Sequence, residues 1–529
     1  MKPTIFFLIN SIDVNRGGLT RASLKQASFF AEMGYNTYML TFNFNLNYPE
    51  IRKKLYEMNK VHKNVIIPNM YEELEGHKKP LIAKHPPKTA SLEKLSEGFT
   101  LEKRSDRNAY RVHKNGLYYK YISLNKNNSL NFIDYYDDNR YRIKRETFDP
   151  WGNVKKVTYM DLVSNKTRQI VYYDNNGRAY LSQWNNPKKN TVQRIFLFDK
   201  NSSVTASYVN DDVSHKIDWL HNTIDRLGGN KSVVVSDTRS TDEVLIHLNH
   251  PKAAKIWRMH SSHLDAPFTV DAPITEKVEP GLNSIDEFDV SVFLTEEQKQ
   301  DVIRRIGDKG NIKVIPHYHA EPDKKTKKLK SLFSRNEKDR YEEKDRNLAV
   351  IISRLSSLKR IEHSIKAFKL VVDKVPNAKL EIWGTGEEEA KLQRLITKSG
   401  LNDHIFLKGY THYPDKIYQR GLFSLMTSKK EGFALSVLES MYNKTPVISY
   451  KIKYGPSDMI VNNDNGFIIE QPEIEELANR MIHMFENPDK AIEMGSKARK
   501  YIDKNFNKNV YKEKWMETVN SALDRKFGK

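Results

Sequence analysis

The segment KKEGFALSVLESM, residues 429–441, holds two glutamates, Glu431 and Glu439, separated by seven mostly small or apolar residues. The Glu-Gly-Phe triplet predicts a turn after an apolar strand, and ALSVLESMYN predicts the start of a helix that carries Glu439 about two turns along. In α/β sheets the turns that follow strands face the ligand crevice. The spacing therefore predicts that Glu431 lies at the mouth of the crevice, while Glu439 lies farther along the helix.

The residues between these glutamates offer backbone groups. Gly432, Phe433, Ala434 and Leu435 stand at the start of the predicted helix, where amide N–H groups and the helix dipole favour an anion. We expect these amides to meet the phosphate of a nucleotide sugar.

Arg354 and Lys359 form a second candidate pair, which follows the apolar strand LAVIIS. A forked guanidinium beside a point-like ammonium matches a diphosphate, and such a pair would stabilise a phosphate leaving group. Two ordinary surface bases in a basic protein would show the same pattern, and this alternative stays open.

Two histidines follow the apolar residues KIW in the segment RMHSSH. His260 and His263 have a spacing that a metal pair can use, but no nearby carboxylates complete a ligand set. We interpret one of them as a hydrogen-bond partner of a substrate hydroxyl. A purely structural histidine is the alternative.

Two loops that contain glycine are weaker signals. Gly17 and Gly18 precede a predicted helix, so the backbone there can approach a phosphate or a sugar, although a Gly-Gly pair is often only a turn. Lys408, Gly409 and Tyr410 follow the strand HIFL and offer backbone groups and a ring to a base. A plain transition from core to loop would look the same.

The elements that must position these residues alternate between strand and helix at both ends of the chain. TIFFLINSI, a glycine turn, an amphipathic helix and TYMLTF predict a βαβ unit at the N-terminus. Between about 75 and 205 the chain changes to short Tyr, Ile, Val and Phe runs broken by Asn, Asp and Gly. Asp149, Asp174 and Asp199 recur there every 25 residues, as in a meander of antiparallel hairpins.

We therefore predict an α/β protein with two Rossmann-like domains facing a cleft and an antiparallel β-rich insertion in the N-terminal domain. The predicted divisions are 1–74 with 206–320 for the N-terminal domain, 75–205 for the insertion, 321–346 for a charged linker, 347–505 for the C-terminal domain and 506–529 for a C-terminal helix.

The overall composition limits the kinds of partner that the protein is expected to bind. The 529 residues carry a formal net charge of +20 and no cysteine, and no apolar run reaches the roughly 20 residues of a transmembrane helix. The basic excess favours an anionic partner, with a solvated basic surface as the alternative, and the lack of cysteine fits a reducing cytoplasm. The sequence shows no GxGxxG fingerprint of a dinucleotide dehydrogenase. It shows no RNP-like, helix-turn-helix or zinc signature either, so we expect no nucleic acid partner.

Taken together, the two-glutamate motif, the Arg-Lys pair, the Gly-Gly loop and the HSSH segment resemble the retaining glycosyltransferases of the GT-B fold, family 4. The segments DVNRGGLT, FLKGYT and IKYGPSDMI, with the β-rich insertion, resemble more closely the wall teichoic acid α-glycosyltransferases. These include poly(glycerol-phosphate) α-glucosyltransferases and poly(ribitol-phosphate) α-N-acetylglucosaminyltransferases. Enzymes that glycosylate serine-rich or Ser-Asp-repeat adhesins share the architecture.

The resemblance implies a UDP-sugar donor and no cofactor or metal, which agrees with the lack of an Asp-x-Asp motif. It implies that Arg354 and Lys359 bind the diphosphate and that Glu439 binds the ribose of uridine. Glu431 would contact the sugar near its reacting face, either as a nucleophile or as a stabiliser of front-face transfer. His263 would lie near the sugar.

For the acceptor, the resemblance implies contacts with His260, Lys453 and Tyr454, and a pocket shaped by Gly17 and Gly18. It further implies that the insertion oligomerises, commonly as a trimer, and helps to hold the acceptor. The C-terminal helix is expected to return to the N-terminal domain.

The leading hypothesis is a retaining hexosyltransferase that moves glucose, or N-acetylglucosamine, from a UDP-sugar to hydroxyls of a wall teichoic acid poly(polyol phosphate). The pair Phe433-Ala434, where some relatives have a polar residue and a glycine, leaves the sugar open. The alternatives are glycosylation of a serine-rich or Ser-Asp-repeat adhesin and a non-catalytic module that binds an anionic polymer. The protein is expected in the cytoplasm, where its basic charge permits peripheral contact with the inner face of the membrane.

Overall fold

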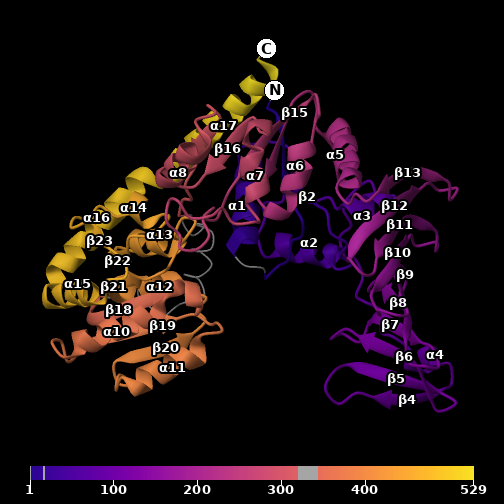
Figure 1. Ribbon diagram of the computed structural model, residues 1–529, viewed down its shortest axis with the longest axis horizontal. Coiled ribbons are helices and arrows are strands. Elements are labelled where there is room, and N and C mark those ends of the chain that lie inside the picture. The colour runs from indigo at the N-terminus through magenta and orange to yellow at the C-terminus, as the bar shows by residue number, and fades with distance from the viewer. Residues whose placement is uncertain (1, 16–17, 320–342, 529) are drawn as a thin grey trace. The chain divides into compact units, whose positions relative to one another are not determined.

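The computed structural model describes residues 2–15, 18–319 and 343–528, and Figure 1 shows how the elements are arranged. By compactness the chain divides into two units, Met1–Ile256 and Trp257–Lys529, with the division inside strand β15 (Ala253–Arg258). Because this division cuts a strand rather than a linker, the domain limits drawn from the sequence stay a prediction. The predicted linker 321–346 lies outside the described residues as far as position 342.

A seven-stranded sheet is built around β1 (Thr4–Ile9), whose residues TIFFLI are all buried. β1 pairs in parallel with β14 and β2, and a strand covered on both faces needs apolar side chains on both. This confirms the βαβ unit predicted at the N-terminus. The strand order is β17-β16-β15-β14-β1-β2-β3, with β2 (Thr37–Thr41), β3 (Val65–Ile66), β14 (Ser232–Ser236), β16 (Val290–Phe293) and β17 (Ile312–Val314). The helices along this part of the chain are α1 (Gly18–Glu32), α2 (Tyr48–Glu57), α3 (Met70–Glu75), α5 (Ser214–Leu227), α6 (Asp242–His247), α7 (Glu279–Asn283) and α8 (Glu296–Ile306), with the 3-10 turns η1 (Arg239–Thr241) and η2 (Ile285–Glu287).

The β-rich region forms a ten-stranded sheet in which every strand pairs with the next one along the chain. All of these pairings are antiparallel, which confirms the predicted meander. The short helix α4 (Leu92–Ser96) precedes it. The strands are β4 (Thr100–Lys103), β5 (Ala109–Lys114), β6 (Leu117–Leu124), β7 (Leu130–Tyr136), β8 (Arg142–Phe148), β9 (Val154–Met160), β10 (Thr167–Tyr173), β11 (Ala179–Asn186), β12 (Thr191–Phe198) and β13 (Val204–Val209).

Four turns of this sheet repeat one hydrogen-bond pattern, and in the first of them Asp137 accepts from the amides of Asn139 and Tyr141. The Oδ1 atom of Asp149 accepts from the amides of Trp151 and Asn153, both at 2.9 Å. Asp174 and Asp199 accept in the same way from the amides two and four residues ahead. An aspartate that satisfies two amides of a tight turn explains why this residue type recurs along the meander.

The C-terminal sheet has six parallel strands in the order β20-β19-β18-β21-β22-β23. Numbered along the chain, this is the order 3-2-1-4-5-6 of a doubly wound sheet, as predicted. The strands are β18 (Asp345–Ile352), β19 (Lys379–Trp383), β20 (Ile405–Gly409), β21 (Gly421–Met426), β22 (Val447–Tyr450) and β23 (Gly466–Ile469). The helices are the 3-10 turn η3 (Ser357–Lys359), α10 (Ile361–Val372), α11 (Glu389–Lys398), α12 (Pro414–Arg420), α13 (Leu435–Tyr442), α14 (Pro456–Met459), α15 (Ile474–Glu486) and α16 (Pro488–Asn505).

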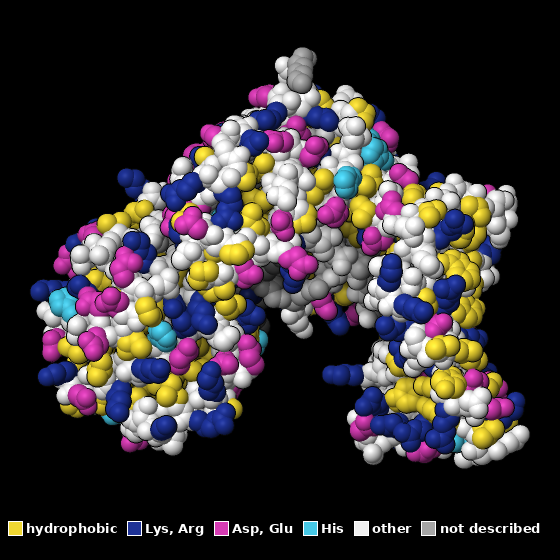
Figure 2. All heavy atoms as spheres, in the orientation of Figure 1, with side chains coloured by type: hydrophobic (Ala, Val, Ile, Leu, Met, Phe, Trp, Pro, Cys, Tyr) yellow, Lys and Arg dark blue, Asp and Glu magenta, His cyan; other side chains and the backbone are white. Residues whose placement is uncertain are grey.

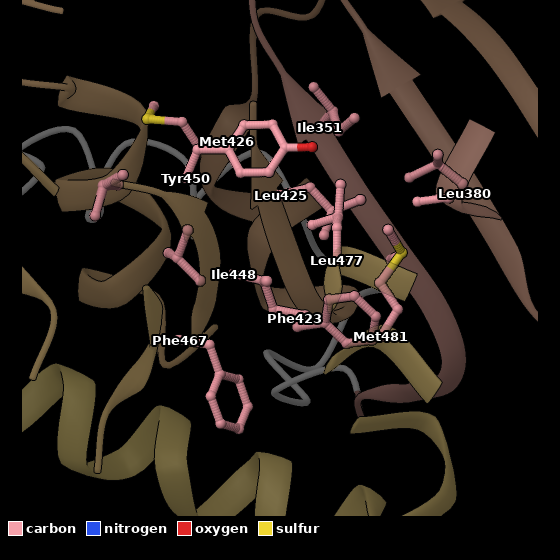
Figure 3. Close-up of a cluster of buried hydrophobic side chains, with 14 of the residues drawn as sticks. Ile351, Leu380, Phe423, Leu425, Met426, Ile448, Tyr450, Phe467, Leu477 and Met481 are labelled. Carbon is pink, nitrogen blue, oxygen red and sulfur yellow. The ribbon is translucent and has the colours of Figure 1, made fainter. Parts of the chain in front are cut away.

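One large apolar core supports the six-stranded sheet. Figure 3 shows Phe423 and Ile448, from the neighbouring strands β21 and β22, near Leu477 and Met481 of α15. All four side chains are fully buried. Burial of each such side chain contributes about 1.5–3 kcal/mol, so the loops that leave these strands start from a rigid base.

The chain ends in α17 (Lys508–Phe527), which is capped by Asn507 through the amides two and three residues ahead. Trp515 of this helix is fully buried, and the guanidinium of Arg258 lies 5.3 Å from its ring. The tail is thereby packed into the second unit. Among the described residues, no helix combines the length and the apolarity needed to cross a bilayer.

Candidate active site

The strand order of the six-stranded sheet defines where a ligand can bind. β18 and β21 are neighbours at the point where the strand order reverses, and open α/β sheets bind ligands beyond the carboxyl ends of such strands. The loop after β18 carries Arg354 and Lys359, and the loop after β21 carries Glu431. The topology therefore brings together two of the patterns that the sequence singled out separately.

Glu431 and Lys359 form an ion pair. The hydroxyl of Ser428 donates a second hydrogen bond, 2.8 Å long, to the same carboxylate oxygen, Oε1. The side chains of Lys359 and Glu431 are 19% and 17% exposed, so solvent screens the pair only in part. The carboxylate is thus held in one orientation by a cation and a hydroxyl, while the side chain of Arg354 in the adjacent loop is exposed.

Hydrogen bonds join the two loops that carry this pair. The guanidinium of Arg360 donates to the carbonyl oxygens of Thr427 and Ser428 at 3.0 and 2.8 Å. The Thr427 hydroxyl donates to the carbonyl oxygen of Lys359 at 3.0 Å, and the amide of Lys429 donates to that of Leu358 at 2.8 Å. The distance between the basic loop and the glutamate turn is therefore fixed by backbone carbonyls and not by the ion pair alone.

The segment after β15 lies against the glutamate turn inside the second unit. A Cβ atom on Gly432 would stand 2.1 Å from the carbonyl oxygen of His260, so only glycine allows this approach. The ammonium of Lys430 donates to the carbonyl oxygen of Leu264 at 2.8 Å. The glycine of the Glu-Gly-Phe triplet thus has a packing role next to the histidine segment.

Glu439 lies closer to the helix start than the sequence predicted. α13 begins at Leu435, because Ala434 takes a left-handed conformation with φ of 65° and ends the turn there. Glu439 therefore belongs to the second helical turn rather than standing about two turns in. Phe433 and Ala434 are buried, so they can offer only backbone groups to a ligand, whereas the Leu435 side chain is 40% exposed.

Comparisons with known proteins agree with this topology. The family described as Glycosyl transferases group 1 matches residues 333–501, and the one described as Glycosyl transferase 1 domain A matches residues 6–199. A crystal structure of TarM superposes with a TM-score of 0.79 at 26% identity, covering 98% of this chain and 99% of that one. A TarM variant from S. aureus in complex with fondaparinux, alpha-GlcNAc-glycerol and UDP gives 0.77 at 25% identity, covering 98% and 100%.

The chain is a glycosyltransferase of the GT-B fold. Among its curated relatives, the poly(ribitol-phosphate) alpha-N-acetylglucosaminyltransferase of Staphylococcus aureus is 28% identical over 98% of this chain and 99% of its own length. The poly(glycerol-phosphate) alpha-glucosyltransferase of Bacillus subtilis is 26% identical over 98% of this chain and 75% of its own length. The fold class and the resemblance drawn from the sequence are confirmed.

The two histidines of this glycosyltransferase lie in different surroundings. The His263 side chain is fully buried and stacks on the ring of Tyr454 at a centroid distance of 5.8 Å. Burial, with the nearby charge of Arg305, lowers the pKa of His263 to about 4, so the ring is neutral at physiological pH. His260 is partly exposed and stacks on His317 at 5.5 Å. Their predicted roles at the sugar and the acceptor stay predictions.

Lys453 and Tyr454, which the resemblance placed at the acceptor, both contact Asp301 of α8. The Lys453 ammonium lies 2.6 Å from an Asp301 oxygen and 3.0 Å from Glu297, and the buried Tyr454 hydroxyl donates to Asp301 at 2.8 Å. Sequence reasoning missed Asp301. A charged residue in the run EEQKQDVIRRI looks like part of a solvated helix face, and no local signal marks its burial.

The glycosyltransferase places Lys408, Gly409 and Tyr410 at the end of β20, two strands away from β18. Lys408 lies 5.9 Å from the ring of Trp383, and Tyr410 is 63% exposed. Gly409 has φ of 72°, which favours glycine. The exposed ring suits stacking with a base, and this assignment stays a prediction.

The loop after β19 has two glycines that sequence reasoning did not select. A Cβ on Gly384 would lie 1.8 Å from the carbonyl oxygen of Ser353, and one on Gly386 would lie 2.2 Å from that of Leu355. They let this loop press against the backbone on either side of Arg354. The two glycines were visible in the sequence as the segment WGTG at the end of an apolar strand, the place where a close backbone approach is expected.

The remaining predicted residues of the glycosyltransferase belong to the first unit. Gly18 is the first residue of α1, and Gly17 lies outside the described residues. Within the parts of the chain that the structure describes, no three His, Asp or Glu side chains gather in a way that would hold a metal ion.

Proposed function

We propose that the protein is a retaining glycosyltransferase that moves glucose or N-acetylglucosamine from a UDP-sugar to hydroxyls of a wall teichoic acid poly(polyol phosphate). The observation that carries the proposal is the Lys359–Glu431 pair at the switch point of the C-terminal sheet. It stands in a chain that matches two wall teichoic acid glycosyltransferases over 98% of its length.

The donor roles follow from the chemistry of the site. Arg354 and Lys359 would hold the diphosphate and stabilise its charge as the sugar departs. Glu431 would face the sugar, where a carboxylate stabilises positive charge that develops at the reacting carbon. When the diphosphate competes for Lys359, the Ser428 hydroxyl keeps Glu431 oriented. Glu439 would bind the ribose of uridine.

The acceptor is assigned on charge and similarity. A net charge of +20 attracts a polymer with one phosphate per repeat, and this attraction falls with added salt. His260, Lys453 and Tyr454 remain our acceptor candidates, with Tyr454 acting from a buried position. We further propose metal-independent transfer, placement in family 4, assembly as a trimer through the ten-stranded sheet, and a cytoplasmic enzyme in peripheral contact with the inner membrane face.

A second candidate acceptor is a serine-rich or Ser-Asp-repeat adhesin. A UDP-N-acetylglucosamine--peptide N-acetylglucosaminyltransferase GtfA subunit from Streptococcus agalactiae is 29% identical over 45% of this chain. The shorter coverage makes this alternative weaker than the polyol phosphate.

The test is sugar transfer by the purified protein. UDP-glucose and UDP-N-acetylglucosamine are each offered to poly(glycerol phosphate), poly(ribitol phosphate) and a Ser-Asp-repeat peptide, with and without a metal chelator. We expect transfer of one sugar to one polyol phosphate, unaffected by the chelator. Transfer to the peptide alone would replace the proposal with the second candidate, and transfer that stops with the chelator would overturn metal independence.

A further inference from the structure

The backbone of Glu431 is hydrogen-bonded to the segment at residues 453 and 454. The amide of Glu431 donates to the carbonyl oxygen of Lys453 at 3.1 Å, and the amide of Tyr454 donates back to the carbonyl oxygen of Glu431 at 2.9 Å. This reciprocal pair of bonds clamps the main chain at the glutamate. Any movement of residues 453 and 454 is therefore passed directly to Glu431.

The side chains of Lys453 and Tyr454 both bind one buried carboxylate, and Lys453 also pairs with Glu297. Asp301 is 3% exposed, and its Oδ2 atom accepts from the Lys453 ammonium at 2.6 Å and from the Tyr454 hydroxyl at 2.8 Å. A carboxylate that accepts charge-assisted bonds in a buried place gives strong and directional contacts. One side chain thus fixes both residues that clamp Glu431.

Two further contacts connect the histidine segment to the clamp and to helix α8. The His263 ring stacks on Tyr454, and Gln298, one helical turn before Asp301, donates to the carbonyl oxygen of Ser261 at 2.9 Å. Helix α8 therefore holds the histidine segment and the clamp together. All of these residues belong to the second compact unit.

The protonation states suit this arrangement. Burial acts to lower the pKa of Lys453, but the hydrogen bonds to Asp301 and Glu297 outweigh this effect and raise the pKa. Burial, followed by the bond to Asp301, raises the pKa of Tyr454. Lys453 therefore stays a cation and the Tyr454 hydroxyl keeps its proton, so both continue to donate to Asp301 over the physiological range.

We propose that Asp301 is a positioning residue that sets the Glu431 turn by holding Lys453 and Tyr454. The inference rests on the proposed function, since it assigns to Asp301 the placement of the glutamate that faces the sugar. None of the described contacts of Asp301 reaches the carboxylate of Glu431, which is held by Lys359 and Ser428. Asp301 therefore positions the main chain of Glu431, whereas Lys359 and Ser428 orient its side chain.

The first test compares Asp301→Asn and Tyr454→Phe with the parent. UDP release from the donor is measured at varied donor concentration, so the readout does not depend on which acceptor is correct. We expect kcat to fall about 10- to 100-fold in Asp301→Asn while the donor KM changes less than about threefold, because a shifted turn affects the transition state more than ground-state binding. Tyr454→Phe removes one of the two bonds and should lose less. The double variant should be no slower than Asp301→Asn, because the bond that Tyr454→Phe removes is one of the two that Asp301→Asn already disrupts.

Asp286→Asn is the matched control. It removes an Asp–Lys pair of similar length, 2.8 Å to Lys309, on the surface of the same unit. We expect its kcat and donor KM to match the parent. An Asp301→Asn enzyme with parental kcat overturns the inference. A double variant whose losses multiply shows that Asp301 and Tyr454 act separately and overturns it as well.

The second test does not require activity. Hydrogen exchange of the Glu431 and Tyr454 amides reports the clamp directly, and we expect faster exchange in Asp301→Asn and in Tyr454→Phe but not in Asp286→Asn. Unchanged exchange overturns the inference whether or not the protein transfers sugar. A parent that transfers sugar to none of the offered acceptors, with faster exchange in Asp301→Asn, would defeat the proposed function and leave Asp301 as the residue that sets this turn. Tyr454→Phe keeps the ring, so the test survives if Asp301→Asn fails to fold.

Discussion

The six-stranded parallel sheet and the ten-stranded antiparallel sheet differ in what covers their strands. Every residue of β21 is buried, and the surrounding helices enclose one large apolar core (Figure 3). In the antiparallel sheet, no residue of β8 is fully buried, and buried apolar residues gather in small clusters such as those around Ile133 and Leu181. Figure 2 shows hydrophobic side chains beside Lys and Arg over the strands of this sheet.

The antiparallel sheet is stabilised by side-chain contacts between neighbouring strands rather than by a large apolar core. Arg145 of β8 makes two hydrogen bonds of 2.7 Å to Asp134 of β7, and its guanidinium lies 3.8 Å from the ring of Phe132. Such pairs stabilise a sheet by modest amounts and leave its faces polar and aromatic. The comparison teaches that the packed sheet suits a site that needs fixed loops, whereas the open sheet suits the presentation of side chains to a partner.

The largest expected effect is on catalysis and belongs to the packed sheet. Glu431→Gln keeps the shape of the side chain but removes its charge, and we expect sugar transfer to fall about 10³-fold with little change in melting temperature. Transfer is measured with saturating donor. The matched control is Glu146→Gln in the antiparallel sheet, where the carboxylate accepts from Tyr135 and Lys144. Near-parental turnover of Glu431→Gln would show that Glu431, and with it this loop of the packed sheet, does not take part in catalysis.

The second prediction compares the two sheets by the same deletion. Ile448 and Ile133 are both buried, the first in the large core and the second in a small cluster. We expect Ile448→Ala to cost about 4 kcal/mol of unfolding free energy and Ile133→Ala about 2 kcal/mol, because surroundings near solvent can close over a cavity. Chemical denaturation, monitored by hydrogen exchange in each of the two sheets, measures both losses of unfolding free energy. Equal costs would show that the two sheets are equally rigid.

The third prediction concerns the two partners of Lys359 inside the site. Lys359→Ala removes a charge partner of the leaving diphosphate and of Glu431, so we expect UDP affinity and kcat to fall together, each about 10- to 100-fold. Calorimetry with UDP and steady-state kinetics measure the two effects. Unchanged affinity and kinetics would show that the diphosphate lies elsewhere.

The smallest expected effect concerns the ion pairs that join the antiparallel sheet to α3. Glu75 pairs with Lys155 of β9 and with His77, and the hydrogen bond that the His77 ring donates to Glu75, opposed by burial, raises the pKa of His77. A raised pKa means that the stability from this contact is complete below about pH 6.5 and is lost as the pH rises through the folded-state value.

His77→Gln should therefore lower stability by less than about 1 kcal/mol at pH 5.5 and by still less at pH 8.5. Melting curves at the two pH values measure the difference. The pair of His247 with Glu243 supplies the control, and His247→Gln should change stability little, because solvent screens this exposed pair. A larger loss at pH 8.5 would contradict the assigned sign.

Much of the fold could be predicted because its signals are local. Apolar runs such as TIFFLI and GLFSLM are strands buried on both faces, and the recurring aspartates mark equivalent turns. The helix that carries Glu439 was predicted, but its start one residue later, at Leu435, was not, because the left-handed conformation of Ala434 is unusual for a residue with a Cβ atom. The burial of Asp301 was equally hidden, because its partners lie 152 and 153 positions away.

The sequence by itself determined the types of elements, their order and the loops that carry reactive side chains. These depend on periodicity and turn chemistry within a few neighbouring residues. Only the tertiary structure decided which charges compensate one another, as Lys359 does for Glu431 and as Asp301 does for Lys453. The physical reason is that the strength of an ion pair depends on distance and burial, and both are set when remote segments pack together.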